Sequence, residues 1–131
     1  IMAERNTHFK DGQLLPFKLA AATEIEAGNM AALNADGYAV EASDTASIVV
    51  AGVADETVDN TSGADGDKII RVRRKKVFKF KNSSTSAVTQ AQVGSNVYVE
   101  DSETVASATT NSIVAGVCMG IDTDGVWVEI R

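Results

Sequence analysis

The sequence predicts a small all-β domain, either a β-barrel or a β-sandwich, and three observations support this prediction. Short apolar segments alternate with turn residues along most of the chain. The apolar residues are mainly Ala, Val and Ile, and no segment shows the periodicity of a long helix. With 131 residues, of which 44% are apolar, the chain has the length and composition of one folded domain. We therefore expect an extended arm over residues 1–15 and a single β domain over residues 16–131.

The expected strands follow the apolar segments. They cover residues 17–20, 30–33, 38–41, 47–54, 69–81, 96–100, 112–119 and 126–130. Residues 34–37 (Asn-Ala-Asp-Gly) and 122–125 (Asp-Thr-Asp-Gly) predict hairpin turns, because Gly tolerates a positive φ. Residues 59–67 predict a polar loop, and residues 88–93 predict one helical turn.

Two of these segments have distinctive patterns. Residues 47–54 are almost continuously apolar, which predicts a strand buried on both faces. Within residues 69–81 the alternation is interrupted at residues 73–76, which predicts a bulge or a bend. After that break, Phe78 and Phe80 alternate with Lys79 and Lys81, so the two aromatic side chains should enter the core.

The chain also contains an internal similarity. Residues 28–30 (Gly-Asn-Met) precede a segment that ends in Ser-Ile-Val-Val-Ala-Gly-Val at residues 47–53. Residues 94–97 (Gly-Ser-Asn-Val) precede another that ends in Ser-Ile-Val-Ala-Gly-Val at residues 112–117. This pattern predicts two similar β units, with a chance similarity between two Val-rich strands as the alternative.

Charge is distributed unevenly. The net charge is −6, yet eight of the twelve Lys and Arg residues lie in residues 68–81, where there is no acidic residue. We call residues 68–81 the basic stretch. It could be a solvated strand edge, a surface that docks on an acidic protein surface, or a nucleic-acid site. Protein docking is the favoured interpretation, because a nucleic-acid platform needs exposed aromatic side chains beside the basic ones.

Catalytic and metal-binding patterns are scarce, so the chain is predicted not to be an enzyme and to need no cofactor or metal. The single His8 lies in the predicted arm, and Cys118 lies in an apolar segment, which predicts a buried thiol. The turn at residues 122–125 followed by Glu129 lacks the spacing of a calcium loop. No apolar segment has the length of a membrane helix, and no leader sequence is recognisable, so we expect no membrane partner.

The arm and the basic stretch contain the candidate partner-binding residues. Pro16 favours an extended conformation at Leu15, and Phe9, Leu14 and Leu15 could anchor an extended arm, with a frayed terminus as the alternative. The candidate residues are Arg5, Phe9, Leu14, Leu15, Arg71, Arg73, Arg74, Lys75 and Lys76.

Three segments resemble a family of small cement (decoration) proteins of tailed-phage capsids. They are residues 26–33 (Glu-Ala-Gly-Asn-Met-Ala-Ala-Leu), residues 50–54 (Val-Ala-Gly-Val-Ala) and residues 93–99 (Val-Gly-Ser-Asn-Val-Tyr-Val). The similarity lies in the order and spacing of the segments over residues 24–130. The sequence departs from the family pattern at residues 74–76 (Arg-Lys-Lys), where the family has a glycine before the Val-Phe strand.

The resemblance implies a β protein that binds the outside of an expanded capsid and bridges copies of the major capsid protein. It also implies assembly in the host cytoplasm, a virion location, and a homotrimer, with a dimer as the second alternative. A nucleic-acid-binding β-barrel that uses the basic stretch, and a tail or baseplate component, are the alternative functions.

Overall fold

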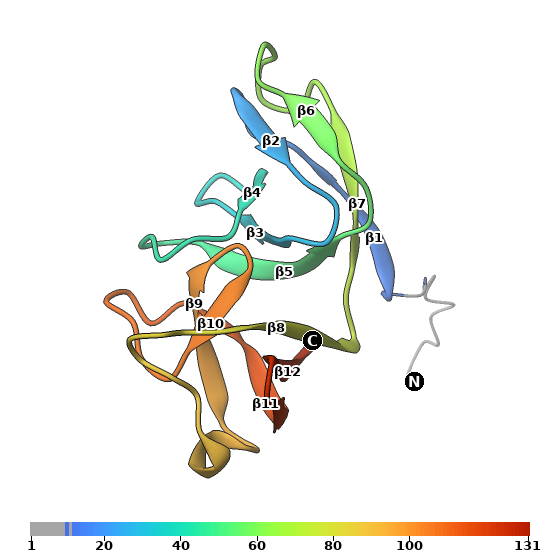
Figure 1. Cartoon of the computed structure of the whole chain (residues 1–131). Helices are drawn as coiled ribbons and strands as arrows, with labels where there is room; N and C mark the ends of the chain where they lie inside the picture. The colour runs from blue at the N-terminus through green and yellow to red at the C-terminus, as the bar shows by residue number, and fades with distance from the viewer. Residues whose placement is uncertain (1–9, 11) are drawn as a thin grey trace, which may run out of the picture.

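The computed structural model describes residue 10 and residues 12–131, and this part of the chain is all-β apart from one turn of 3-10 helix (Figure 1). The elements are β1 (Leu14–Lys18), β2 (Thr23–Ile25), β3 (Met30–Leu33), β4 (Ala39–Glu41), β5 (Val49–Ala54), β6 (Val58–Asn60), β7 (Ile69–Arg73), β8 (Lys76–Asn82), η1 (Gln90–Gln92), β9 (Asn96–Asp101), β10 (Thr104–Ala106), β11 (Val114–Asp122) and β12 (Gly125–Ile130). The predicted all-β fold is therefore confirmed.

The strands form two units with the same topology. In the second unit, β10, β8, β12, β11 and β9 form a closed barrel in that order. In the first unit, a sheet has the strand order β1, β7, β5, β3, β4. This order corresponds to the order β8, β12, β11, β9, β10 around the barrel. The parallel β10–β8 pair of the barrel corresponds to a parallel bridge between Leu19 and Ala39, which joins the end of β1 to β4. The prediction of two similar β units is confirmed at the level of topology.

Matching backbone contacts show which residues correspond. Gly28 and Gly94 precede β3 and β9 with φ angles of 88° and 89°. The N–H of Gly28 donates to the carbonyl of Ala54, and the N–H of Gly94 donates to that of Cys118. The two serines that begin the repeated apolar segments, Ser47 and Ser112, also share a positive φ. The sequence similarity between the halves therefore reflects equivalent backbone positions.

The two units share part of their core. One cluster of buried residues lies within the first unit and includes Leu19, Ile25 and Ile70. The larger cluster combines barrel residues of the second unit with Met30 and Val53 of the first unit. Only residues 74 and 75 separate β7 from β8, so the chain passes from one unit to the next without a flexible linker. The predicted single domain thus consists of two closely packed units.

Several local predictions are confirmed. The turn at residues 34–37 joins β3 to β4, with Gly37 at a φ of 85°, and the turn at residues 122–125 joins β11 to β12. The break expected within residues 69–81 separates β7 from β8, and Lys75 lies there at a φ of 61°. Cys118 is buried, and η1 is the expected helical turn.

Other predictions need correction. The segment 47–54 is not buried on both faces throughout, because Val49 is 67% exposed at the start of β5. The first strand begins at Leu14 rather than at residue 17, so Leu14 and Leu15 of the predicted arm belong to the first sheet. The loop predicted at residues 59–67 begins inside β6. The three-residue strands β2, β6 and β10 were not predicted, since three residues cannot establish an alternating pattern.

Candidate partner-binding surface

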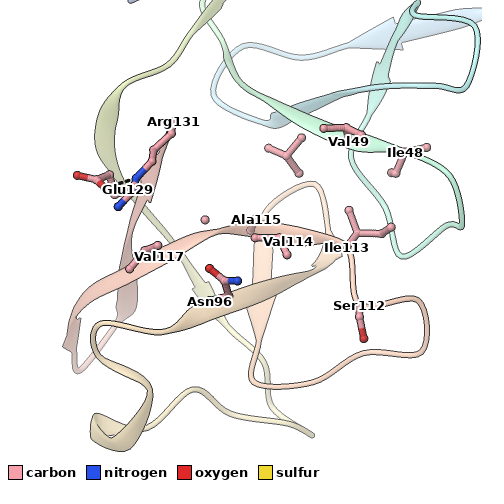
Figure 2. A pocket seen from close by; sticks show the side chains of 12 residues that line it. Ile48, Val49, Asn96, Ser112, Ile113, Val114, Ala115, Val117, Glu129 and Arg131 are labelled. Atoms are coloured by element: carbon pink, nitrogen blue, oxygen red, sulfur yellow. Dashed lines mark hydrogen bonds and ion pairs between the residues drawn. The ribbon is translucent and has the colours of Figure 1, made fainter.

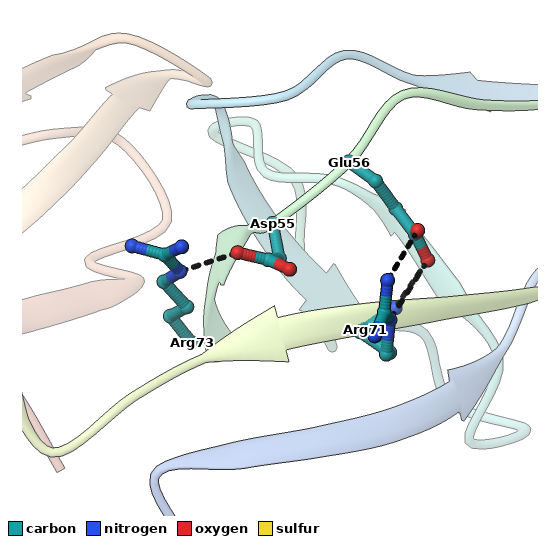
Figure 3. Close-up of polar contacts among 4 residues, drawn as sticks. All are labelled: Asp55, Glu56, Arg71 and Arg73. Carbon is teal, nitrogen blue, oxygen red and sulfur yellow. Dashed lines mark hydrogen bonds and ion pairs between the residues drawn. The ribbon is translucent and has the colours of Figure 1, made fainter.

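The basic stretch lies on two strands of different units, and its arginines on β7 form ion pairs within the chain. Arg71 and Arg73 are exposed on β7, opposite carboxylates that directly follow β5 (Figure 3). The Arg71 Nη2 lies 3.0 Å from Glu56 Oε2, and the Arg73 guanidinium contacts the Asp55 carboxylate. The hydrogen bonds from Arg71 lower the pKa of Glu56, and Glu56 in turn raises the pKa of Arg71.

Two of the three lysines of β8, Lys79 and Lys81, are also paired with carboxylates. Lys79 Nζ lies 2.5 Å from Asp124 Oδ1, and Lys81 Nζ lies 3.2 Å from Glu103 Oε2. The contact with Lys79 lowers the pKa of Asp124. Phe80 is buried and Phe78 is half-buried, which confirms that the aromatic side chains of this strand enter the core. These pairs reduce the positive charge that the basic stretch presents to solvent.

A basic cluster remains where the first unit ends and the second begins. We call Arg74, Lys75, Lys76 and Arg131 the basic junction. The Arg74 Nη2 donates to the carbonyl of Arg131 over 2.7 Å, and the N–H of Lys75 donates to the carbonyl of Ile130. Within the described chain, Arg74, Lys75 and Lys76 take part in none of the side-chain ion pairs with carboxylates. Arg131 is paired with Glu129 over 3.0 Å, so the positive charge that the junction offers to a partner is that of Arg74, Lys75 and Lys76.

The structure brings several predicted residues together at this junction. Leu14 lies opposite Arg73 in the β1–β7 pair, and the N–H of Arg74 donates to the carbonyl of Gln13. Leu14 is exposed, whereas Leu15 is half-buried opposite Val72. Arg5 and Phe9, the other two predicted residues, lie outside the described residues, as does His8.

An apolar groove adjoins the junction, and the sequence did not predict it. The groove has a volume of about 450 Å³ and runs between β5 and β11 (Figure 2). Its walls include Ile48, Val49, Ile113 and Val114, and Glu129 and Arg131 also line it. We call this the apolar groove. Val114 is 43% exposed there, so both repeated Ser-Ile-Val segments present a valine to solvent.

The repeated segments were the one signal that could have led to this groove. The first of them was interpreted as a strand buried on both faces, because a continuous apolar run is typical of such a strand. The exposure arises because neighbouring strands stop early: β7 pairs with β5 only at Val53 and Ala54, and β12 pairs with β11 only from Val117 onward. Sequence patterns do not reveal where a distant neighbour ends.

The predicted polar loop at residues 59–67 contains three aspartates after the start of β6, Asp59 included. Its carboxylates accept hydrogen bonds from backbone N–H groups: Asp59 from Thr61, Asp65 from Ala21, and Asp67 from Ala64. The first of these bonds lowers the pKa of Asp59. In the described residues, no group of three His, Cys, Asp or Glu side chains is arranged to hold a metal ion. The loop carboxylates therefore fix the turns of the loop.

Comparison with known proteins gives no match: no protein-family model matches the chain, and neither a curated protein nor a solved structure is significantly similar to it. The fold and the surface define the chain as a small all-β protein of two duplicated units, with an apolar groove beside a basic junction. Among the described residues, no helix is long and apolar enough to span a bilayer.

Proposed function

We propose that this chain is a capsid cement protein that binds the outside of an expanded phage head and bridges neighbouring copies of the major capsid protein. The observation that supports this proposal best is the exposed apolar groove beside the basic junction. Contiguous apolar surface with charged residues at its rim is typical of a protein-binding site. Bridging requires such contact surfaces and a stiff body, and it requires no reacting group.

The resemblance to cement proteins supports the same function. Two of the segments that carry it, residues 26–33 and 93–99, contain the Gly-led starts of β3 and β9, which are equivalent in the two units. The third segment, residues 50–54, lies in β5. We propose a homotrimer as the binding form, with a dimer as the second alternative. An oligomer on a symmetric shell forms several contacts at once, so weak individual contacts add up to a high avidity.

Nucleic-acid binding is the less favoured function. Arg71, Arg73, Lys79 and Lys81 have carboxylate partners within the chain, and the net charge is −6. A polyanion would have to displace those carboxylates and approach an acidic molecule. We expect negligible affinity for DNA at moderate salt, measured by fluorescence anisotropy with a labelled duplex. Salt-sensitive binding that is lost when Arg74, Lys75 and Lys76 are replaced by Gln would instead support a nucleic-acid function.

Co-sedimentation with phage particles tests the cement function. Purified protein is mixed separately with expanded capsids, procapsids and isolated tails of the phage, and each mixture is sedimented. We expect the protein to sediment with expanded capsids at saturable stoichiometry. Binding to tails alone would support the tail or baseplate alternative, and absence from all three pellets would refute the proposal.

Deletion of residues 2–9 tests the arm while leaving β1 intact, because β1 begins at Leu14. If Arg5 and Phe9 contact the shell, this deletion weakens capsid binding and leaves the circular dichroism spectrum and the thermal midpoint unchanged. Unchanged capsid affinity would remove both residues from the proposed contact surface.

A further inference from the structure

We propose that the apolar groove binds an extended segment of the major capsid protein by strand addition, and this inference rests on the proposed cement function. In strand addition, an extended segment forms main-chain hydrogen bonds with an open strand edge, and its alternate side chains fill adjacent pockets. The groove provides open edges, apolar walls and a charged end, and each of these features restricts the occupant.

The open edges require an extended occupant. Val49 and Val50 of β5 pair with β3, whereas β7 pairs only with Val53 and Ala54. Val114 of β11 pairs with Tyr98 of β9, whereas β12 begins to pair at Val117. At Val49, Val50 and Val114, the backbone of each groove strand therefore has a strand partner on one side only in the described chain. Backbone N–H and C=O groups on such an edge are satisfied most completely by another strand.

Other open strands of this chain are protected, which makes the groove edges unusual. Strands β2, β4 and β6 have three residues each, and short edge strands are poor templates for pairing. At the two ends of β1, Gln13 accepts a backbone hydrogen bond from Arg74 and Leu19 donates one to Lys68, and both partners flank β7. Because hydrogen-bonded positions alternate along an antiparallel pair, Pro16 lies at a position whose backbone faces away from β7. Pro16 has no N–H to offer there.

This contrast argues for a foreign strand rather than a second copy. In the described residues, the open edges outside the groove include β1, which Pro16 interrupts, and residues Lys76–Phe80 of β8, which carry the kind of lysine that protects strand edges. Two copies related by a two-fold axis would have to place groove against groove, and two concave surfaces cannot fill each other. A segment of the major capsid protein is limited neither by the protected strand edges of this chain nor by the need to pack one groove against another.

The lining defines the chemistry of the segment. Val49 and Val114 are exposed on opposite walls, so an inward-facing apolar side chain of the segment can pack between them (Figure 2). Arg131 lies at one end of the groove, and its carbonyl is bound by Arg74. Arg131 itself is paired with Glu129 over 3.0 Å, so it is the remaining charge of Arg74, Lys75 and Lys76 beside the groove that favours an acidic residue at that end of the segment. The occupant is an extended, apolar segment with an acidic residue at one end.

Charge insertion in the groove tests this assignment on expanded capsids. Val49→Asp and Val114→Asp each place a carboxylate in the groove, and Met119→Asp is the control, because Met119 is also an exposed strand residue (51%) but does not line the groove. We expect each groove variant to lower capsid affinity at least tenfold and Met119→Asp to change it less than twofold. Circular dichroism must show that all three variants are folded. Groove variants that bind like the wild type would overturn the inference while leaving the cement function standing.

Amide hydrogen exchange distinguishes strand addition from side-chain docking and identifies the occupant. Within residues 48–51 and 113–116, the amides that face away from β3 and β9 should exchange fast in the free protein and at least tenfold more slowly on capsids, whereas the loop at residues 61–67 should not change. Slow exchange of these outward-facing amides in the free protein would mean that this chain or a second copy already fills the groove, and would overturn the inference. Unchanged exchange on capsids would do the same. Wild-type protein that does not sediment with capsids would overturn both this inference and the cement function.

Discussion

Gly52 and Gly116 allow the backbones of neighbouring strands to approach closely at equivalent positions in the two units. A Cβ atom on Gly116 would lie 2.2 Å from the carbonyl oxygen of Glu129, and one on Gly52 would lie 2.1 Å from that of Arg73. These contacts are with backbone atoms, which cannot rotate away as a flexible side chain can. The Ala-Gly-Val repeat of the sequence therefore marks a packing requirement between β5 and β7 and between β11 and β12.

Gly116→Ala should lower the free energy of unfolding by about 1–3 kcal/mol, because the added methyl group overpacks the contact with β12. Gly120→Ala is the matched control on the same strand, since its Cβ would meet only a Trp127 side-chain atom at 3.9 Å. Urea denaturation of both variants measures the difference. Equal stability of the two variants would show that β12 moves to accommodate the methyl group.

The ion pair between Arg71 and Glu56 should make stability depend on pH. The pKa of Glu56 is lowered in the folded protein, so the pair stabilises the fold above the ordinary glutamate pKa, about 4.3, and the gain is lost as the pH falls through the folded pKa. Glu56→Gln should therefore destabilise the protein at pH 7 and have a smaller effect at pH 3. Urea denaturation at both values tests this, with Arg71→Gln as the control. A pH-independent effect of Glu56→Gln would contradict it.

At the residue scale, the sequence showed where the basic residues cluster but not which carboxylates they pair with. Clustering of basic residues in the basic stretch was evident, yet Glu56 lies 15 positions before Arg71 and Glu103 lies 22 positions after Lys81. Such partners are brought together by strand pairing, so local charge counting overestimated the free positive charge. Of the predicted contact residues, Arg74, Lys75 and Lys76 are the basic ones without a carboxylate partner in the described chain.

At the level of elements, the residues at the open strand edges differ between parts of the molecule. The outer edge of β1 contains Pro16, whereas the groove edges of β5 and β11 contain apolar residues with intact N–H groups. Proline at an edge blocks the addition of further strands and so limits aggregation. Pro16 was interpreted in the sequence as a signal of an extended arm, and its position in β1 assigns it this protective role.

Pro16→Thr should therefore promote self-association without unfolding the protein. Threonine restores an N–H on the outer edge of β1 and favours a strand conformation. We expect light scattering at high protein concentration to show larger species than the wild type, with an unchanged circular dichroism spectrum. Ser62→Thr, in the loop after β6, is the control and should behave like the wild type. Identical scattering of Pro16→Thr and the wild type would show that β1 is protected in another way.

Strand existence was largely predictable, because most strands carry their own alternation or apolar run. Hairpin turns with Asp-Gly pairs were also evident, since Gly37 and Gly125 directly follow an aspartate. The groove could not be predicted in this way. It depends on where β7 and β12 end relative to β5 and β11, and this is a property of pairing register between segments distant in sequence.

At the scale of the whole molecule, the shared core should make the two units unfold together. Met30 and Val53 of the first unit pack in the same cluster as Val126 and Ile130 of the second. Trp127, the only tryptophan, lies on β12 and reports on the second unit. Its fluorescence can therefore reveal whether damage to the first unit is transmitted to the second.

Ile70→Ala removes a fully buried side chain from the cluster confined to the first unit. We expect a loss of about 2–5 kcal/mol, and Ile130→Ala in the second unit should cost about the same. Both variants should shift a single transition that is identical by Trp127 fluorescence and by circular dichroism. A fluorescence transition that Ile70→Ala leaves unchanged would show that the units unfold independently.

The two-residue passage from β7 to β8 has a mechanical consequence. Tension applied to one unit reaches the other through Arg74 and Lys75 and through their backbone hydrogen bonds with Gln13 and Ile130. Since those bonds connect to β1 and β12, a pull is distributed over several strands rather than over one covalent tether. The molecule should therefore deform as one stiff body, with far less compliance than two domains joined by a flexible linker.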